Sequence, residues 1–232
     1  MNSAISLQLL EWDTGFFGFG IGRLETAILD SAVVVQTKAW CSANGVRCVY
    51  FIADNGSAAA ERAGFLRVDT RLTYGIEPTR QRPDPLIRPQ QDGDVRRLKN
   101  IATSAHRDGR FYQDPNFGDA AASRFYEAWI ENACDGFADV VLVADEGSGA
   151  AGYITCRAEA RTGTIGLVGV ASDYRGRGIG SRLVQASLDW FSRAGLARVD
   201  VATQQRNHAA RNLYEGRGFE LVRRQAFYHY WP

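Results

Sequence analysis

The stretch VGVASDYRGRGIGSRL, at residues 168–183, determines how the rest of the chain is interpreted. An apolar strand over residues 165–170 leads into a turn with glycines at every second position. An amphipathic helix follows, with apolar Val184, Leu188 and Phe191 spaced four and then three residues apart. Glycine lets the backbone turn sharply and approach a ligand closely, and the first amides of a helix have no intrahelical acceptor. Strand, turn and helix start therefore predict an anion site suited to a phosphate or pyrophosphate.

The spacing of the glycines narrows the kind of phosphate ligand. The dinucleotide pattern G-x-G-x-x-G does not fit the run G-R-G-I-G, and no Lys follows the glycines as the phosphate loop of nucleotide hydrolases requires. The pattern R-x-x-G-x-G fits, with Arg175, Gly178 and Gly180 at its fixed positions. In this pattern the chain resembles the GNAT superfamily of N-acetyltransferases, which implies acetyl-coenzyme A (acetyl-CoA) as co-substrate. A glycine-rich turn without such a role is the alternative that the six-residue pattern alone leaves open.

A second motif lies downstream, where residues 207–219 read NHAARNLYEGRGF. They match the family pattern N-x-x-A-x-x-x-Y-x-x-x-G-F, with Asn207 expected to cap a short helix over residues 208–215. The resemblance implies that Tyr214 is the catalytic acid that protonates the departing thiolate. A phenol with an ordinary pKa near ~10 keeps its proton at pH 7 and can donate it. Packing of Tyr214 against the C-terminal strand is the alternative interpretation.

The resemblance also implies which residues hold the coenzyme. Val168 and Val170 would bond the pantetheine along the strand edge, and one amide near Val170 would polarise the thioester carbonyl. The other expected cofactor contacts lie in the loop and at the downstream helix cap: Arg175, Gly176, Arg177, Gly178, Ile179, Gly180, Ser181 and Asn207. No metal is implied.

The general base is less well defined by the sequence. The strand over residues 165–170 contains no carboxylate, and an amino-sugar amine can lose its proton to a water wire. Asp69 could end such a wire, and an ordinary surface aspartate is the alternative. His106, His208 and His229 are scattered along the chain and are interpreted as structural.

Three segments, residues 10–18, 124–133 and 201–204, resemble more narrowly the GNAT enzymes that act on dTDP-amino sugars. This implies acetyl transfer to the amine of a dTDP-4-amino-4,6-dideoxyhexose in surface-polysaccharide biosynthesis. Aromatic and arginine side chains suit thymine and pyrophosphate, and the candidates are Trp12, Phe16, Phe17, Arg110, Phe111 and Tyr112. Core packing is the alternative for Phe16 and Phe17. Another nucleotide amino sugar, a peptide N-terminus or a lysine as acceptor stays open, as does a non-catalytic coenzyme A sensor.

The order of predicted elements indicates an α/β fold with a mixed central sheet. Residues 1–78 are expected to form a smaller, partial GNAT-like α/β domain, and the Pro-rich residues 79–93 a linker. From residue 94 to 232 the predicted order is that of a complete GNAT domain: two helices, three strands, loop and helix, strand, helix, strand. The sequence of strand, short helix, Gly-Phe and strand occurs at residues 46–76 and 197–231, as a degenerate duplication or by chance.

Composition limits the classes of partner. The 232 residues carry a formal net charge of +1, which argues against nucleic acid or an anionic membrane surface as the main partner. The small-molecule acceptor is what the resemblance implies. A homodimer stays open. Cys41, Cys48, Cys134 and Cys156 lack metal-ligand spacing and are expected to be reduced thiols of a cytoplasmic protein. The chain shows neither a signal-peptide start nor an apolar run of membrane-spanning length.

Overall fold

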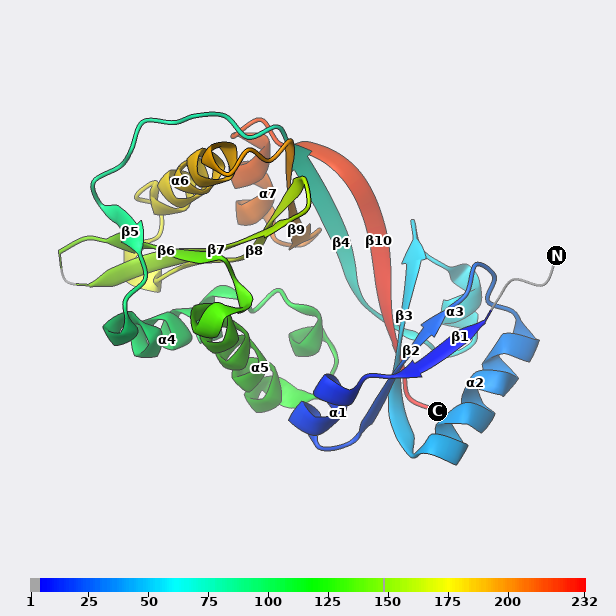
Figure 1. Ribbon diagram of the computed structural model, residues 1–232. Helices are drawn as coiled ribbons and strands as arrows, with labels where there is room; N and C mark the ends of the chain where they lie inside the picture. Colours follow the sequence, from blue (N-terminus) through cyan, green and yellow to red (C-terminus); the bar gives the residue numbers. More distant parts are fainter. Residues whose placement is uncertain (1–4, 148) are drawn as a thin grey trace. The chain divides into compact units, whose positions relative to one another are not determined.

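The computed structural model describes residues 5–147 and 149–232, which divide into two compact units (Figure 1). Unit 1 contains the described residues up to Arg71, Gly109–Ala121 and Arg223–Pro232. Unit 2 contains Leu72–Asp108 and Ala122–Val222. The contacts thus group segments that are distant in sequence, whereas the sequence predicts consecutive domains. The division into a partial GNAT-like domain at residues 1–78, a linker at 79–93 and a complete GNAT domain at 94–232 stays a prediction.

Unit 1 is a small mixed sheet with helices on it. Its strands lie in the order β1, β2, β3 and β10; β2 and β3 are parallel, and the other neighbouring pairs are antiparallel. The bounds are β1 Ser6–Leu9, α1 Glu11–Phe17, β2 Gly20–Glu25, α2 Ser31–Asn44, β3 Val46–Asp54, α3 Ala58–Arg62, the 3₁₀ helix η2 Arg110–Gln113 and β10 Glu220–Tyr230, of which the residues from Arg223 onward belong to this unit.

The two faces of this sheet bury different side chains, because side chains alternate along a strand. Val49 and Phe51 of β3 pack with Tyr228 of β10 in a core that α2 and α3 cover (Figure 1). The intervening Tyr50 lies opposite His229 of β10 on the other face. That second face carries an aromatic cluster that no periodic pattern in the sequence indicates. Its members are Phe17, Phe19, Tyr50, Phe111, Phe117, His229 and Trp231.

Unit 2 contains the glycine-rich loop. Its strands lie in the order β4, β9, β8, β7, β6 and β5, with β8 and β9 parallel and β5 to β8 antiparallel. The strands are β4 Leu66–Ile76, from Leu72 onward in this unit, β5 Ile87–Pro89, β6 Val140–Asp145, β7 Ala150–Glu159, β8 Thr162–Val170 and β9 Arg198–Gln204. The helices are η1 Asp92–Asp94, α4 Val95–Ala105, α5 Gly118–Asn132, of which the residues from Ala122 onward belong to this unit, η3 Ala133–Phe137, η4 Ser172–Tyr174, α6 Ile179–Arg193 and α7 His208–Glu215.

Helices cover both faces of the unit 2 sheet (Figure 1). A Cβ on Gly152 of β7 would lie 3.2 Å from Ile179 and from Leu183 of α6. The next residue of β7, Tyr153, points to the opposite face and meets His106 at the end of α4. The predicted helical stripe is confirmed, because the α6 residues Val184, Leu188 and Phe191 are all buried.

A β-bulge shapes the C-terminal half of β8. Ile154 pairs with Val168 but Cys156 pairs with Ile165, so Gly166 and Leu167 together lie opposite Thr155. The Leu167 amide donates to the Thr155 hydroxyl at 2.9 Å in place of a strand carbonyl. The register of β8 with β9 ends at Ile165, although β8 continues to Val170. The last residues of β8 therefore run on beyond the paired part of β9.

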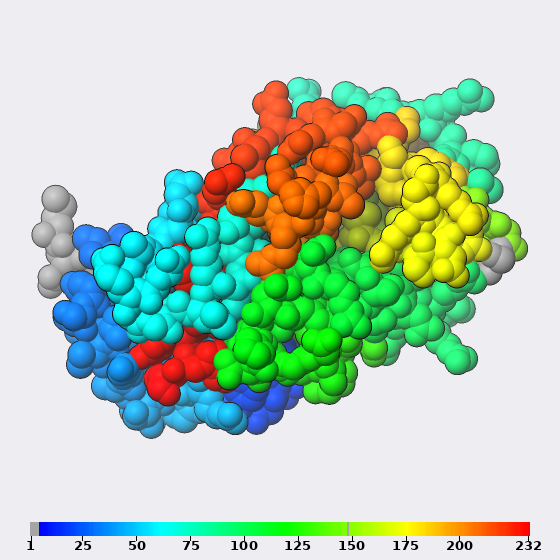
Figure 2. All heavy atoms as spheres, turned by 180° about the vertical axis from the view of Figure 1, so that it is seen from behind, coloured from blue at the N-terminus to red at the C-terminus, as the bar shows by residue number. Residues whose placement is uncertain are grey.

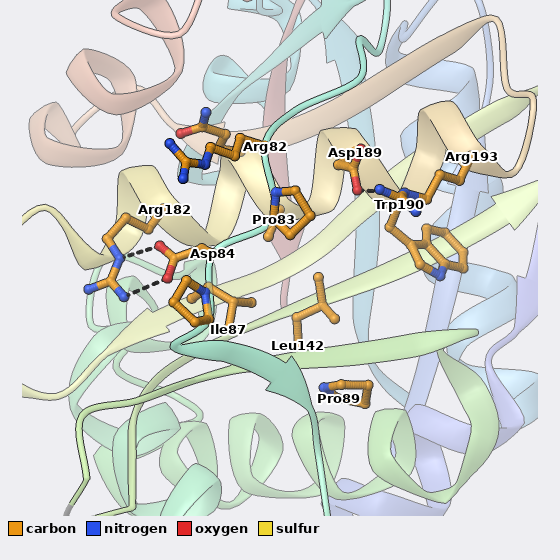
Figure 3. Close-up of a pocket in the computed structure, with 13 residues that line it drawn as sticks. Arg82, Pro83, Asp84, Ile87, Pro89, Leu142, Arg182, Asp189, Trp190 and Arg193 are labelled. Atoms are coloured by element: carbon orange, nitrogen blue, oxygen red, sulfur yellow. Dashed lines mark hydrogen bonds and ion pairs between the residues drawn. The ribbon is translucent and has the colours of Figure 1, made fainter.

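The segment expected as a linker crosses the outer side of α6. Asp84 accepts two hydrogen bonds from Arg182, and the Gln81 amide donates to Asp189. A groove of about 710 Å³ lies between this segment and α6, lined in part by Trp190 (Figure 3). Within residues 79–93 the chain also forms β5 and the start of η1. Among the described residues no helix is both long and apolar enough to cross a membrane.

Candidate active site

The loop between β8 and α6 turns on two glycines. Gly176 and Gly178 have φ values of 75° and 77°, in the left-handed region that glycine adopts without the steric cost that other residues incur. A 3₁₀ turn precedes them, in which the Arg175 amide donates to the Ser172 carbonyl at 3.2 Å. Gly178 is the N-cap of α6, and no side chain caps this helix.

The backbone amides of residues 176–181 are the central feature of the loop. Within the described residues none of them donates to a protein acceptor, and the first bonded amide is that of Arg182, to the Gly178 carbonyl at 3.1 Å. Residues 175–178 are exposed, and the yellow surface of this region faces the viewer in Figure 2. A run of free amides at the positive end of a helix dipole is suited to a pyrophosphate.

The side chain of Arg175 binds protein carbonyls. Its Nε donates to the Val170 carbonyl and its Nη2 to the Ser104 carbonyl, each at 3.1 Å. These bonds tie the end of β8 to the end of α4 and so fix the start of the loop. The sequence did not predict this role, which gives a structural reason for arginine at this position of the motif.

The other polar side chains of the predicted cofactor site also have protein contacts. The Arg177 guanidinium lies 5.1 Å from the ring centroid of Tyr174. The Ser181 hydroxyl accepts from Arg217 Nε. The Asn207 side-chain oxygen accepts from a backbone amide in the first turn of α7 at 3.0 Å, as its predicted capping role requires. Their roles toward a coenzyme stay predictions.

Gly180 brings three parts of the site together. A Cβ at this position would lie 3.3 Å from Leu213 Cδ2 of α7 and 3.9 Å from Val170 Cγ2 of β8. Val168 and Val170 are half-buried and pack against the core cluster that also contains Tyr214. The first turn of α6 therefore packs close to both α7 and the end of β8.

Tyr214 of α7 is buried, with 4% of its surface exposed. Its ring packs near Tyr74, with centroids 6.2 Å apart, and near Phe219, at 5.6 Å. Burial raises the pKa of this phenol, which keeps it protonated through the neutral range. In the part of the chain that the structure describes, its hydroxyl forms no hydrogen bond, whereas that of Tyr74 donates to Glu215 at 2.7 Å. A hydroxyl without a protein acceptor is available to a ligand.

Comparison with known proteins agrees with this geometry. Residues 97–219, just over half of the chain, match the sequence profile described as the Acetyltransferase (GNAT) family. The chain belongs to the GNAT family. It is an acyltransferase, and enzymes of this fold use acetyl-CoA for N-acetyl transfer.

Curated relatives of this GNAT chain include two whose names refer to a sugar or a polysaccharide. It is 29% identical to "dTDP-fucosamine acetyltransferase" of Escherichia coli O6:H1 over 214 residues, covering 90% of this chain and 91% of that protein. It is 26% identical to "Spore coat polysaccharide biosynthesis protein SpsD" of Bacillus subtilis over 144 residues, covering 62% of this chain and 50% of that protein. The chain thus spans nearly all of the first relative and half of the second.

Solved structures share the GNAT fold at low sequence identity. A GCN5-related N-acetyltransferase from Sphaerobacter thermophilus aligns with a TM-score of 0.69 and 18% identity, covering 98% of this chain and 76% of that one. A functionally unknown conserved protein from Staphylococcus epidermidis aligns with a TM-score of 0.70 and 15% identity, covering 99% and 91%. These likenesses support the fold alone.

His106, directly after α4, is a neutral structural group. Its Nε2 is 2.9 Å from the Tyr153 hydroxyl, and its ring stacks on Tyr126 with centroids 4.9 Å apart. Burial, with a smaller effect of the Arg175 charge, lowers its pKa to about 4. Across residues 5–147 and 149–232 no cluster of His, Cys, Asp or Glu is arranged to hold a metal ion.

The predicted acceptor contacts lie in unit 1. Trp12 is half-exposed and stacks on Phe16 with centroids 5.1 Å apart. Phe17 packs against Phe111, at 5.1 Å, within the aromatic cluster. Asp69, the candidate base, is buried in the same unit, and its role stays a prediction.

The sequence reasoning missed a buried pair that anchors η2. Asp114, directly after η2, accepts from His229 Nδ1 at 2.7 Å and from Trp231 Nε1 at 3.0 Å. Both members of the Asp114–His229 pair have fully buried side chains, and burial lowers the pKa of His229 to about 4. His229 is therefore neutral at pH 7. The partners stand 115 positions apart, so no local motif could have indicated the pair.

Proposed function

We propose that the chain moves an acetyl group from acetyl-CoA to the amine of a nucleotide amino sugar of the dTDP-4-amino-4,6-dideoxyhexose class. The observation that carries this proposal is the free amide run of residues 176–181 within one compact unit that also holds the partnerless hydroxyl of Tyr214. The relative named dTDP-fucosamine acetyltransferase supports the acceptor class over nine-tenths of the chain. The spore-coat relative supports a place in surface-polysaccharide biosynthesis.

Backbone groups would hold the donor. The amides of residues 176–181 would bind the pyrophosphate, with the conformation of Arg175 fixed by its own carbonyl contacts. Val168 and Val170 would bond the pantetheine along the part of β8 that runs beyond its pairing with β9. Asn207 would complete the cofactor contacts at the start of α7.

Acetyl-CoA supplies an activated thioester. When the neutral amine adds to the carbonyl carbon, an amide near Val170 stabilises the negative charge on the carbonyl oxygen, a contribution of roughly 3 kcal/mol. The carbon–nitrogen bond then replaces the carbon–sulfur bond. Tyr214 gives its proton to the thiolate and regains one from solvent, while the amine proton leaves through water, with Asp69 as candidate end of that path.

The proposal also covers the class of partner, the location and the oligomeric state. The net charge of +1 supports a small-molecule acceptor rather than nucleic acid or a membrane surface. A cytoplasmic location fits an enzyme that uses acetyl-CoA and a nucleotide sugar, and we keep a homodimer as a prediction.

A panel of acceptors tests the proposal. Release of free thiol from acetyl-CoA is measured with dTDP-amino sugars, other nucleotide amino sugars, peptides with free N-termini and lysine peptides. We expect the highest kcat/KM with a dTDP-4-amino sugar. Turnover on peptides alone would favour a protein acceptor, and binding of acetyl-CoA without turnover on any amine would favour a sensor.

A further inference from the structure

Two arginines of unit 1 converge on one aromatic ring. The guanidinium carbon of Arg110, on η2, lies 5.5 Å from the ring centroid of Phe227, and that of Arg71, on β4, lies 5.8 Å from it. Among residues 5–147 and 149–232 neither guanidinium has a carboxylate or another hydrogen-bond partner. Arginines that gather at one aromatic ring are normally paired with acidic groups, so two of them without a carboxylate partner indicate a ligand.

Aromatic rings support Arg110 without using its donors. Its guanidinium also lies 4.5 Å from the Tyr50 centroid and 4.7 Å from that of Phe111. Stacking on a ring uses the face of the guanidinium and leaves the N–H groups at its edge free. Those donors match the geometry of phosphate oxygens, which arginine binds bidentately.

The two charges repel each other in the absence of an anion. Desolvation, and next the charge of Arg110, lower the pKa of Arg71, although the residue as a whole is exposed. Asp69 opposes this shift only in part. A multivalent anion bound between the guanidinium groups would remove the repulsion, so the arrangement favours a diphosphate over a neutral ligand.

A buried anchor holds Arg110 in place. Asp114 follows η2 and is bonded to His229 and Trp231 of the C-terminal segment. Because the Asp114–His229 pair is fully buried, the short helix that carries Arg110 is fixed to β10. A cation held in place before binding loses little conformational freedom when the ligand arrives.

We propose that Arg71 and Arg110 bind the diphosphate of the acceptor nucleotide, and that Tyr50, Phe111 and Phe227 form the aromatic base of this site. All five residues belong to unit 1. Because it rests on the proposed nucleotide-sugar acceptor, its test measures nucleotide binding apart from acetyl transfer.

The experiment titrates the whole chain, saturated with coenzyme A, with dTDP in a calorimeter. Saturation occupies the amide loop, which would otherwise compete for the diphosphate. We expect Arg110→Ala and Arg71→Ala each to weaken dTDP binding about tenfold or more, since each removes charge-assisted hydrogen bonds. Arg110→Lys should lose less, because a lysine keeps the charge but not the fork. Thymidine, which lacks phosphate, should bind weakly and equally to all variants.

Arg47→Ala is the matched control. Arg47 lies over another ring of unit 1, 5.0 Å from the Phe19 centroid, and its loss should leave dTDP affinity unchanged. Thermal unfolding of each variant checks that it folds, and Arg110→Lys retains a cation on the rings if Arg110→Ala does not fold.

The outcomes separate this proposal from the proposed function. Unchanged dTDP affinity in both alanine variants, or no dTDP binding by the unmodified chain, would overturn the diphosphate site. Arginine-dependent dTDP binding supports it even if no dTDP-amino sugar is acetylated, a result that would overturn the acceptor assignment alone. With an active acceptor, Arg110→Ala should raise the KM for the nucleotide sugar about tenfold or more, whereas Arg47→Ala should leave that KM unchanged.

Discussion

Replacing Tyr214 by Phe separates catalysis from stability. The change removes one hydroxyl that has no hydrogen-bond partner among the described residues, from a side chain that is 4% exposed. If the hydroxyl is the acid, kcat falls by about 10²- to 10⁴-fold, the range for a positioned general acid. This corresponds to about 3–5 kcal/mol in activation free energy. The KM for acetyl-CoA should change little, because backbone amides would hold the pyrophosphate.

The stability of this variant is predicted from the same observation. Because the hydroxyl of Tyr214 forms no hydrogen bond among the described residues, its removal breaks no hydrogen bond within the protein. The free energy of unfolding should therefore stay nearly constant. Since burial raises the pKa of Tyr214, kcat of the unmodified enzyme should also show no loss from deprotonation of this group up to about pH 10.

Tyr74→Phe is the matched control, with the opposite expectation. Its hydroxyl donates to Glu215 at 2.7 Å, and its ring lies near that of Tyr214. Loss of this charge-assisted bond should lower the free energy of unfolding by about 1–2 kcal/mol and leave kcat nearly unchanged. Urea unfolding and thiol release at saturating acceptor measure both quantities. An unchanged kcat in Tyr214→Phe would refute the acid role. If Tyr214→Phe lowered the free energy of unfolding as much as Tyr74→Phe, the Tyr214 hydroxyl would have a hydrogen-bond partner.

Two further predictions concern the bulge and pH. Thr155→Val deprives the Leu167 amide of its acceptor, so the free energy of unfolding should fall by about 1–3 kcal/mol and the KM for acetyl-CoA should rise. Urea unfolding and steady-state kinetics measure these two quantities. No change in either would show that the bulge does not need the Thr155 hydroxyl. His106 and His229, each with its pKa lowered to about 4, are neutral in the fold but titrate near ~6.5 when unfolded. The unfolded state therefore binds more protons between pH 6.5 and 4, and stability should fall there by about 3 kcal/mol for each; a flat curve of unfolding free energy against pH would contradict this.

The parts of the site that depend on local chemistry could be predicted from the sequence. The positive φ values at Gly176 and Gly178 follow from the need for a sharp turn before a helix. The cap at Asn207 and the buried stripe of α6 follow from short-range patterns in the same way. In each case the interacting residues lie within about two helical turns of one another.

The features that could not be predicted depend on residues distant in the sequence. Nothing local to Asp114 indicates His229 as its partner, and the carbonyls that Arg175 binds include one that is 71 positions away. The bulge is an intermediate case. Gly166 inside an apolar strand is a recognised sign of a bulge, but its position opposite Thr155 depends on the pairing register.

The antiparallel pairing of β3 with β10 has a consequence for how the protein is made. Tyr228 and Tyr230 complete the core of unit 1, and the Tyr228 hydroxyl binds the Ser57 amide from 171 positions away. During translation, the apolar strand β3 therefore emerges from the ribosome long before β10, its neighbour on one side, has been made. Until then, one edge of β3 is open to other chains. We infer that unit 1 matures only after translation has nearly finished, and that nascent chains stalled before β10 are targets for chaperones or aggregation.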